Sequence, residues 1–221
     1  MKILKQFLLY FHTIKKLKFR QVYYTVYYKF KKFIPKRIQL ISGLDEFTII
    51  PLNPSYTPFY RSVKLKSKNE FNILNIRHDF SSKINWNELK FGRLWNYHLQ
   101  YAEFLLDENL SIPERIDVLE DLSSDILHQK LPLEPYPVSL RIVNTILFLT
   151  IHKYETPEIK TALKYQIEFL KNNLEFQIDG NHLLENLIAL RIASLFVKDL
   201  DGLSKIKGLL KSSLQEQINT D

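Results

Sequence analysis

The stretch Ser111-Ile-Pro-Glu-Arg-Ile-Asp-Val-Leu-Glu-Asp-Leu-Ser-Ser-Asp-Ile126 decides the fold class. Ser111 and Glu114 have the spacing of a capping box, in which each residue satisfies a free backbone N–H of the other. Pro113 lies in the first turn, where its missing N–H costs nothing. Apolar residues follow at helical spacing, so the stretch predicts an amphipathic helix with one buried face. These residues are Ile116, Leu119, Leu122 and Ile126.

Similar helical patterns occur on both sides of this stretch. An apolar stripe from Leu94 to Leu105 precedes it, and further helices are predicted to start at Pro137, Thr156-Pro157, Gly180-Asn181 and Leu203. Short connections make consecutive helices antiparallel neighbours. We therefore expect residues 88–221 to form an all-α fold, an incomplete (α/α) toroid built of antiparallel helical hairpins. A solenoid is the alternative that the pattern leaves open.

The chain before residue 88 has a different character. Pro35, Pro51, Pro54 and Pro58 disfavour helices in residues 34–87. Phe47-Thr-Ile-Ile50 and Phe71-Asn-Ile-Leu74 are candidates for short strands. We expect residues 34–87 to be an extended or irregular linker that wraps onto the helical domain.

The N-terminal arm, residues 1–33, carries most of the positive charge. Residues 1–44 contain eleven of the 31 Lys and Arg and no Asp or Glu, so the rest of the chain is slightly acidic. That distribution argues against a uniformly basic nucleic-acid-binding protein. Apolar residues from Ile3 to Leu17 recur at helical spacing among the lysines, which predicts a basic amphipathic helix. Such a helix can lie on an anionic membrane surface or pack on its own protein with the lysines in solvent.

The sequence shows no signal peptide and no apolar run long enough to span a bilayer. A cytoplasmic, at most membrane-peripheral, location is therefore expected. Cysteine is absent, which excludes disulfides and thiolate metal sites. The six histidines form no i, i+4 pair, and the sequence has no phosphate-binding glycine loop. We expect neither a metal nor a cofactor.

Three polar patches interrupt the otherwise apolar helices, in residues 94–101, 135–144 and 179–186. Asn181 and His182 fall at the start of a predicted helix, where free backbone N–H groups and the helix dipole favour an anion. Together the patches predict a groove that binds a polyhydroxylated anion. The candidate site residues are Tyr97, His98, Tyr136, Arg141, Asn144, Asn181, His182 and Asn186.

Each candidate also has a structural interpretation. Arg141 can fork onto a carboxylate of a ligand or of the protein itself, and Asn144, three residues later, can donate an amide hydrogen from the same helical face. Asn181 can serve simply as a helix N-cap, a role that asparagine often takes. His182 can be an ordinary surface histidine.

The order of these patches resembles the heparinase II/III-like polysaccharide lyases, in particular alginate lyase-like members found beside bacterial surface-polysaccharide genes. The resemblance covers roughly residues 70–221. Thr145 departs from it, because the family usually has tryptophan after the asparagine. The matching segments are Phe71-Asn-Ile-Leu74, Ile84-Asn-Trp86 with Leu94-Trp-Asn-Tyr97, Pro135-Tyr-Pro-Val-Ser-Leu-Arg141 with Asn144, and Gly180-Asn-His-Leu-Leu-Glu-Asn186.

The resemblance implies an α/α toroid followed by a β-sandwich, and β-elimination next to a uronic acid. Asn181 would then neutralise the uronate carboxylate, and His182 would assist it or act as the base. The other six candidates would contact the acidic, uronate-containing polysaccharide.

In the family, a catalytic tyrosine, a further histidine and the sandwich follow the helix that ends here near Asp221. We therefore expect a C-terminally truncated form that is inactive alone, or one whose second half comes from a partner chain. The alternative is a non-enzymatic module that binds acidic glycans or acts as a scaffold in surface-polysaccharide biosynthesis.

Overall fold

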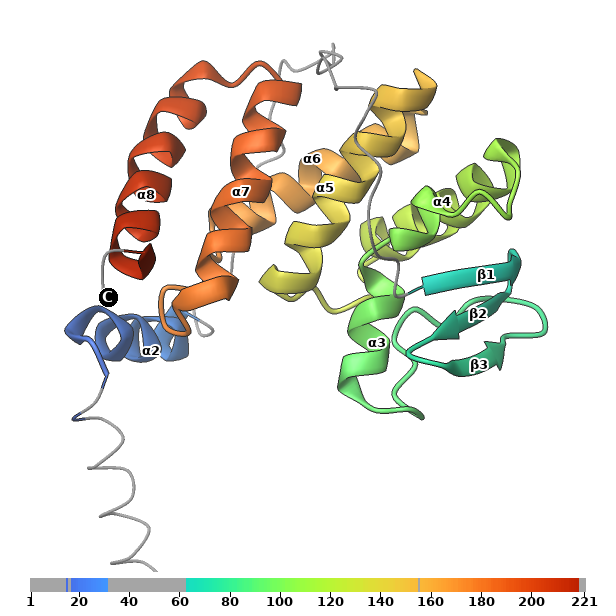
Figure 1. Cartoon of the computed structure of the whole chain (residues 1–221), viewed down its shortest axis with the longest axis horizontal. Helices are drawn as coiled ribbons and strands as arrows, with labels where there is room; N and C mark the ends of the chain where they lie inside the picture. The colour runs from blue at the N-terminus through green and yellow to red at the C-terminus, as the bar shows by residue number, and fades with distance from the viewer. Residues whose placement is uncertain (1–14, 16, 32–62, 155, 219–221) are drawn as a thin grey trace, which may run out of the picture.

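The computed structural model describes residues 15, 17–31, 63–154 and 156–218. Most of this part of the chain is helical, as the sequence predicts (Figure 1). The elements, in chain order, are α2 (Phe19–Lys31), β1 (Val63–Ser67), β2 (Glu70–Ile73), β3 (Ile76–Asp79), α3 (Arg93–Gln100), the short 3-10 helix η1 (Glu103–Leu106), α4 (Ile112–Leu127), α5 (Pro135–His152), α6 (Pro157–Lys171), α7 (Gly180–Phe196) and α8 (Leu200–Ile218).

Two helix starts confirm the sequence prediction. The Ser111 hydroxyl accepts a hydrogen bond from the Glu114 N–H, and the Glu114 carboxylate accepts one from the Ser111 N–H, which completes the capping box of α4. At α6, the Thr156 hydroxyl accepts from the Ile159 N–H. Each cap satisfies backbone donors that the first helical turn leaves free.

Other helix bounds differ from the prediction. The first helix ends at Gln100 instead of continuing to Leu105, because Ala102 adopts a left-handed conformation with φ 58°. A left-handed residue cannot continue a right-handed helix. α8 begins at Leu200, three residues earlier than expected, since the Asp199 carboxylate accepts a hydrogen bond from the Gly202 N–H and caps it. Helix α5 begins at Pro135, two residues before Pro137.

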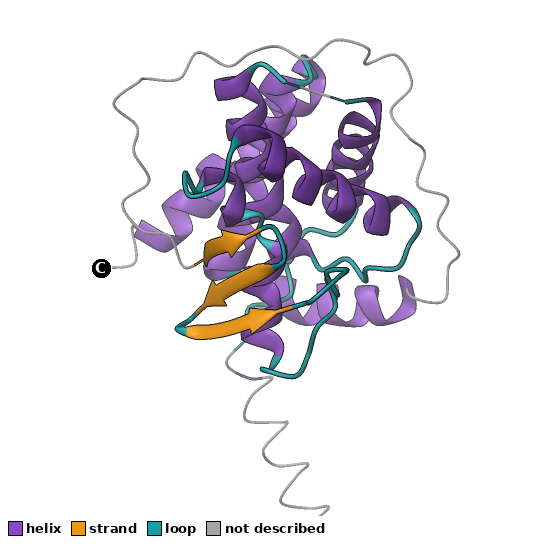
Figure 2. Ribbon diagram, turned by 90° about the vertical axis from the view of Figure 1, so that its right-hand side faces the viewer, coloured by secondary structure: helices purple, strands orange, loops and turns teal. Residues whose placement is uncertain are grey.

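Residues 63–79 form a three-stranded antiparallel sheet in the order β1-β2-β3. Strand β2 matches the predicted strand Phe71-Asn-Ile-Leu74, whereas β1 and β3 were not predicted. The other predicted strand, Phe47-Thr-Ile-Ile50, lies outside the described residues. Strands β2 and β3 are joined by Leu74 and Asn75, both with positive φ, as a two-residue hairpin requires. The sheet lies at one side of the helices (Figure 2), and its Val63, Phe71 and Ile73 side chains belong to the main core.

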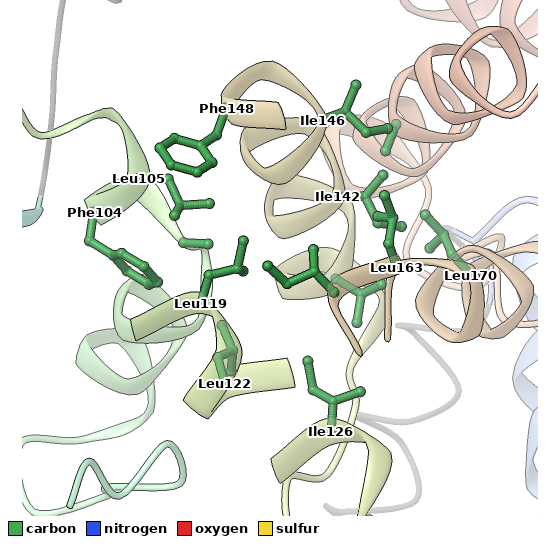
Figure 3. Packing of buried hydrophobic residues seen from close by; sticks show 14 of the residues in the cluster. Phe104, Leu105, Leu119, Leu122, Ile126, Ile142, Ile146, Phe148, Leu163 and Leu170 are labelled. Atoms are coloured by element: carbon green, nitrogen blue, oxygen red, sulfur yellow. The ribbon is translucent and has the colours of Figure 1, made fainter. Parts of the chain in front are cut away.

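The core joins the sheet to the helices in one continuous apolar cluster. Phe104 and Leu105 of η1 face Leu119 and Leu122 of α4 (Figure 3). On the other side, Ile142 of α5 lies near residues of α6. The predicted apolar stripes therefore meet in the interior.

Helices α3, α5 and α7 run in the same direction, side by side. Tyr97 contacts Glu134, and Gln100, further along α3, contacts Arg141, further along α5. Ser139 of α5 likewise contacts Asn186 of α7. α4 packs on α6, and α8 packs on α7 (Figure 1). We call α3, α5 and α7 the parallel row.

Candidate functional site

A line of aromatic rings crosses the parallel row. The His98 and Tyr101 rings lie 4.9 Å apart between centroids, Tyr101 and Tyr136 lie 6.1 Å apart, and Tyr136 and His182 lie 4.3 Å apart. These four side chains come from the end of α3, the start of α5 and the start of α7. Residues from all three polar patches of the sequence therefore meet at one end of the row. We call these four residues the ring line.

His182 ends the ring line and has a carboxylate partner. Its Nδ1 lies 3.2 Å from Oε1 of Glu175, which is buried in the connection between α6 and α7. The His182 side chain is 38% exposed. When Nδ1 carries the proton of the neutral ring, it donates a hydrogen bond to Glu175, and Nε2 keeps a free lone pair. A carboxylate in this position fixes the tautomer of a histidine that accepts protons.

Glu175 is held in place by a buried amide. Asn186 Nδ2 donates to Glu175 Oε2 at 3.2 Å and to the Ser139 hydroxyl at 2.9 Å, and its Oδ1 accepts from the Glu175 N–H at 2.9 Å. Asn186 itself is completely buried. The predicted direct contact of Asn186 with a sugar is not supported by this position. The structure instead places Asn186 behind Glu175, where it positions the carboxylate.

Asn181 is exposed at the start of α7, next to His182. It is not the N-cap, because Asp179 occupies that position with φ 63°. Within the described part of the chain, no hydrogen bond occupies the Asn181 amide. Asp179 instead forms ion pairs with Lys18 and Arg20. Although burial alone would raise it, these two cations hold the pKa of Asp179 below its ordinary value.

Tyr97 lies one turn before Tyr101, and its hydroxyl donates to Glu134 Oε2 at 2.5 Å. Arg93 binds the other oxygen of the same carboxylate at 3.0 Å. Burial and the bond to Glu134 raise the pKa of Tyr97 to about 12. Burial also lowers the pKa of His98, against the opposing effect of Glu103. Tyr97 and His98 are both partly exposed.

Arg141 occupies a different environment from the predicted one. It is 1% exposed, with Nε donating to Gln166 Oε1 at 2.5 Å and Nη1 donating to the Gln100 carbonyl at 3.1 Å. Burial lowers its pKa to about 9. Its partners are neutral oxygens of α3 and α6 instead of a carboxylate. Arg141 therefore links three helices and does not face a ligand at the surface.

Asn144 also binds backbone rather than facing outward. Its Nδ2 donates to the Tyr101 carbonyl at 2.9 Å, which helps to hold the end of α3 against α5. Thr145, the position that departs from the lyase pattern, is buried in α5. A change at Thr145 would thus alter packing in the interior rather than the surface.

Three residues in or beside the assembled site were missed by the sequence prediction, namely Glu175, Glu185 and Tyr101. Glu175 lies in a connection without periodic pattern, seven residues before its partner His182, so no spacing rule points to it. Glu185 lies on α7 one turn after His182, and burial raises the pKa of its carboxyl group. Tyr101 lies within the first polar patch, and its ring connects the predicted residues His98 and Tyr136.

The site is a surface feature and lies outside the cavity formed by α2, α4 and α6. A cavity of about 600 Å³ lies between α2, α4 and α6, and none of the eight predicted residues lines it. Its rings are Tyr28, Tyr165 and Phe169. In the described ranges, no group of three or more acidic or histidine side chains could hold a metal ion.

Comparison with known proteins adds no relative: no family model, curated protein or solved structure matches the chain.

Proposed function

We propose that this chain is the helical part of a heparinase II/III-like polysaccharide lyase that acts on a uronic-acid polymer. The observation that carries the proposal is the ring line, which joins residues from three separate motifs and ends at the Glu175–His182 pair. The partly exposed rings of Tyr136 and His182 provide stacking surfaces for sugars, with buried Tyr101 behind them. The exposed Asn181 amide can bind a carboxylate. The motifs thus combine rings that stack on sugars with an amide that binds a carboxylate, as the binding of an acidic glycan requires.

The arrangement of the helices supports the (α/α) toroid as the architecture. In such a toroid alternate helices run parallel in an inner layer, and the helices between them form an outer layer. Here α3, α5 and α7 run in one direction, while α4 packs on α6. The ring line would lie at the rim of the inner layer, where a polymer can cross without threading through the protein.

In the proposed reaction, Asn181 binds the uronate carboxylate and makes the C5 proton easier to remove. The free nitrogen of His182 takes that proton while the imidazole donates to Glu175. The C5–H electron pair forms the C4=C5 double bond, and the C4–O bond to the neighbouring sugar breaks. The departing oxygen takes a proton from an acid, for which Tyr136 is the adjacent phenol. Burial raises the pKa of Tyr136 and keeps that phenol protonated.

The test is affinity electrophoresis in gels that contain a polyuronate, with a neutral glucan as the control polymer. We expect retardation by the polyuronate alone, and its loss in His182→Ala and Asn181→Ala. His128→Ala is the matched control variant, because His128 is an exposed histidine at the end of α4 with its own partner, Ser124. Equal retardation by both polymers, or an equal loss in the control variant, would contradict the proposal.

A second set of measurements separates the lyase part from the binding module. Formation of the C4=C5 double bond is followed by ultraviolet absorbance of the unsaturated product. Product that disappears in His182→Ala supports the lyase, whereas absence of product is what we expect of its helical part alone. Binding that survives both Asn181→Ala and His182→Ala favours the alternative, a non-enzymatic module for acidic glycans, which the ring line supports without any proton transfer.

A further inference from the structure

Helix α2 has two faces with different partners. Its inner face packs on the connection between α6 and α7, residues 172–179. Tyr24 stacks on Phe176 with ring centroids 4.5 Å apart, and the Tyr28 hydroxyl donates to the Leu174 carbonyl at 2.5 Å. Gln21 donates to the Ile178 carbonyl at 3.2 Å. This face fixes the orientation of α2 on the domain.

The outer face of α2 is apolar and exposed. Phe19 is 85% exposed and Phe30 is 68% exposed, and Tyr23, Val26 and Tyr27 are exposed between them. The five positions follow the i, i+4, i+7, i+8, i+11 spacing, which places them within about 100° around the helix axis. We call these five residues the outer stripe. A contiguous stripe of large apolar side chains in water indicates a binding surface.

The charges around the outer stripe favour an anionic partner. The described residues of the N-terminal arm, 15 and 17–31, include five Lys and Arg and no acidic residue. Lys29 is exposed on α2 itself. The acidic side chains that reach α2, Asp179 and Glu216, bind Lys18 and Arg20, so they do not oppose an anion at the outer stripe.

We propose that α2 docks this domain on the surface of an anionic lipid bilayer, with the outer stripe inserted among the headgroups. Rings beside basic residues are typical of helices that lie in the membrane interface. Among the described residues, no helix is long and apolar enough to cross a membrane. At 13 residues, α2 is about 20 Å long, which suits a helix lying in the interface plane.

A second copy of the chain is a weaker candidate for this surface. A stable dimer buries roughly 800 Å² on each partner, whereas one stripe on a 13-residue helix offers only a few hundred. Pairing two arms of equal basic charge would also bring like charges together. A bilayer with anionic lipids instead provides both the apolar contact and the opposite charge.

Docking would bring the membrane close to the candidate site. The connection that α2 holds contains Glu175, and it leads into Asp179 and the start of α7. Figure 1 shows α2 across the end of α7 that carries His182. The inference does not depend on the proposed lyase activity, since it rests on a surface outside the ring line.

Because the chain has no cysteine, single cysteines can report on the surface. Phe19→Cys and Phe30→Cys are labelled with a polarity-sensitive fluorophore, and Glu158→Cys, exposed at the far end of α6, is the control. Vesicles are phosphatidylcholine with or without phosphatidylglycerol. We expect a blue shift of both α2 labels with the anionic vesicles only. No shift, or an equal shift of the Glu158→Cys label, overturns the proposal.

Vesicle flotation of the unlabelled chain measures the contribution of the outer stripe. Phe19→Ser/Phe30→Ser should lower the bound fraction at least about fivefold, because two rings lose their apolar contact. Leu89→Ser/Leu200→Ser, at two exposed leucines elsewhere, should bind as the parent does. High salt should weaken binding, since it screens the basic charges. Equal loss in both double variants contradicts docking through α2.

Sedimentation velocity without vesicles tests whether a second copy of the chain binds the outer stripe. We expect a monomer in the parent chain and in Phe19→Ser/Phe30→Ser. A dimer that dissociates in this variant would assign the outer stripe to self-association and overturn the proposal. Far-ultraviolet circular dichroism should be unchanged in the variant, because both substituted rings are exposed.

Discussion

Arg141 and His182 come from similar polar patches on neighbouring helices, but their surroundings differ completely. Arg141 lies in the interior, where its guanidinium binds neutral oxygens of α3 and α6. His182 lies at the rim, with one nitrogen near Glu175 and its ring beside Tyr136. Asn186 and Asn181 repeat the contrast within a single helix, the first completely buried and the second exposed.

The difference shows that a polar residue in an apolar helix can support a site without belonging to its surface. Buried polar groups must find partners, because an unpaired one costs free energy. Asn186 meets this need by holding Glu175. Arg141 meets it in part, because Nε and Nη1 link three helices while the buried Nη2 has no hydrogen-bond partner in the described part of the chain. The exposed residues face no such requirement and remain available to a ligand.

Arg141→Ala should have the largest effect on stability. It leaves a cavity in the core and removes the donor to Gln166 and to the Gln100 carbonyl. We expect the free energy of unfolding to fall by about 3 kcal/mol, with the relief of a buried charge offsetting part of the loss. Urea denaturation measures the change. A stable variant that has lost glycan binding would show that Arg141 serves the ligand instead.

Asn186→Ala should have an intermediate effect on stability, and it should affect both the interior and the candidate site at the rim. It removes the hydrogen bonds that hold the Glu175 carboxylate and backbone N–H. We expect a loss of about 2 kcal/mol in unfolding free energy, together with severalfold weaker polyuronate binding. Asn186→Asp, which keeps the size and one acceptor, should place a second negative charge beside Glu175 and fail to restore either property.

His182→Ala should change the unfolding free energy by no more than about 0.5 kcal/mol, because the side chain is partly exposed. Polyuronate binding should fall by about tenfold, as expected for a lost hydrogen bond to a charged group. Denaturation and affinity electrophoresis on the same preparation check both values. A large loss of stability without loss of binding would place His182 with the supporting residues.

The smallest expected effect is on the pH dependence of stability, through Tyr97. Its pKa is raised from 10.0 to about 12, so its contribution to stability is complete below pH 10 and is lost as the pH rises through about 12. In that window the unfolded chain ionises first. Tyr97→Phe should therefore lose less stability than the parent from pH 10 to 12, by under about 1 kcal/mol for a partly solvated ring. Identical pH profiles would show that burial and the bond to Glu134 do not raise the pKa of this phenol in the folded chain.

Local chemistry made parts of the fold predictable. The capping box at Ser111 and the Thr156-Pro157 start depend on neighbouring residues, and both are confirmed. The end of α3 was not predictable in the same way, because Ala102 has no intrinsic preference for its left-handed conformation. Packing of η1 against the core stabilises it there.

The sequence predicted many residues of the candidate site, but it did not predict which of them are buried. Helical spacing indicates which residues of one helix share a face, whereas the contact between Tyr136 and His182 comes from the packing of α5 on α7. It does not reveal which neighbour will cover that face, so the burial of Arg141 and Asn186 was missed. Glu175 was missed for a different reason, since a connection has no period and its role comes from the fold.

The common direction of α3, α5 and α7 has an electrostatic consequence. Each helix carries roughly half a positive elementary charge at its N-terminal end and the opposite at its C-terminal end. The starts of α5 and α7 lie together at the rim, and residues at the ends of α4 and α6 line one cavity with Pro135 at the start of α5. The potential therefore changes sign across the wall of the helical array. A chain of regularly spaced negative charges would be drawn toward the starts of α5 and α7 and less toward the end of α3, so the backbone alone gives the ring line a preferred direction.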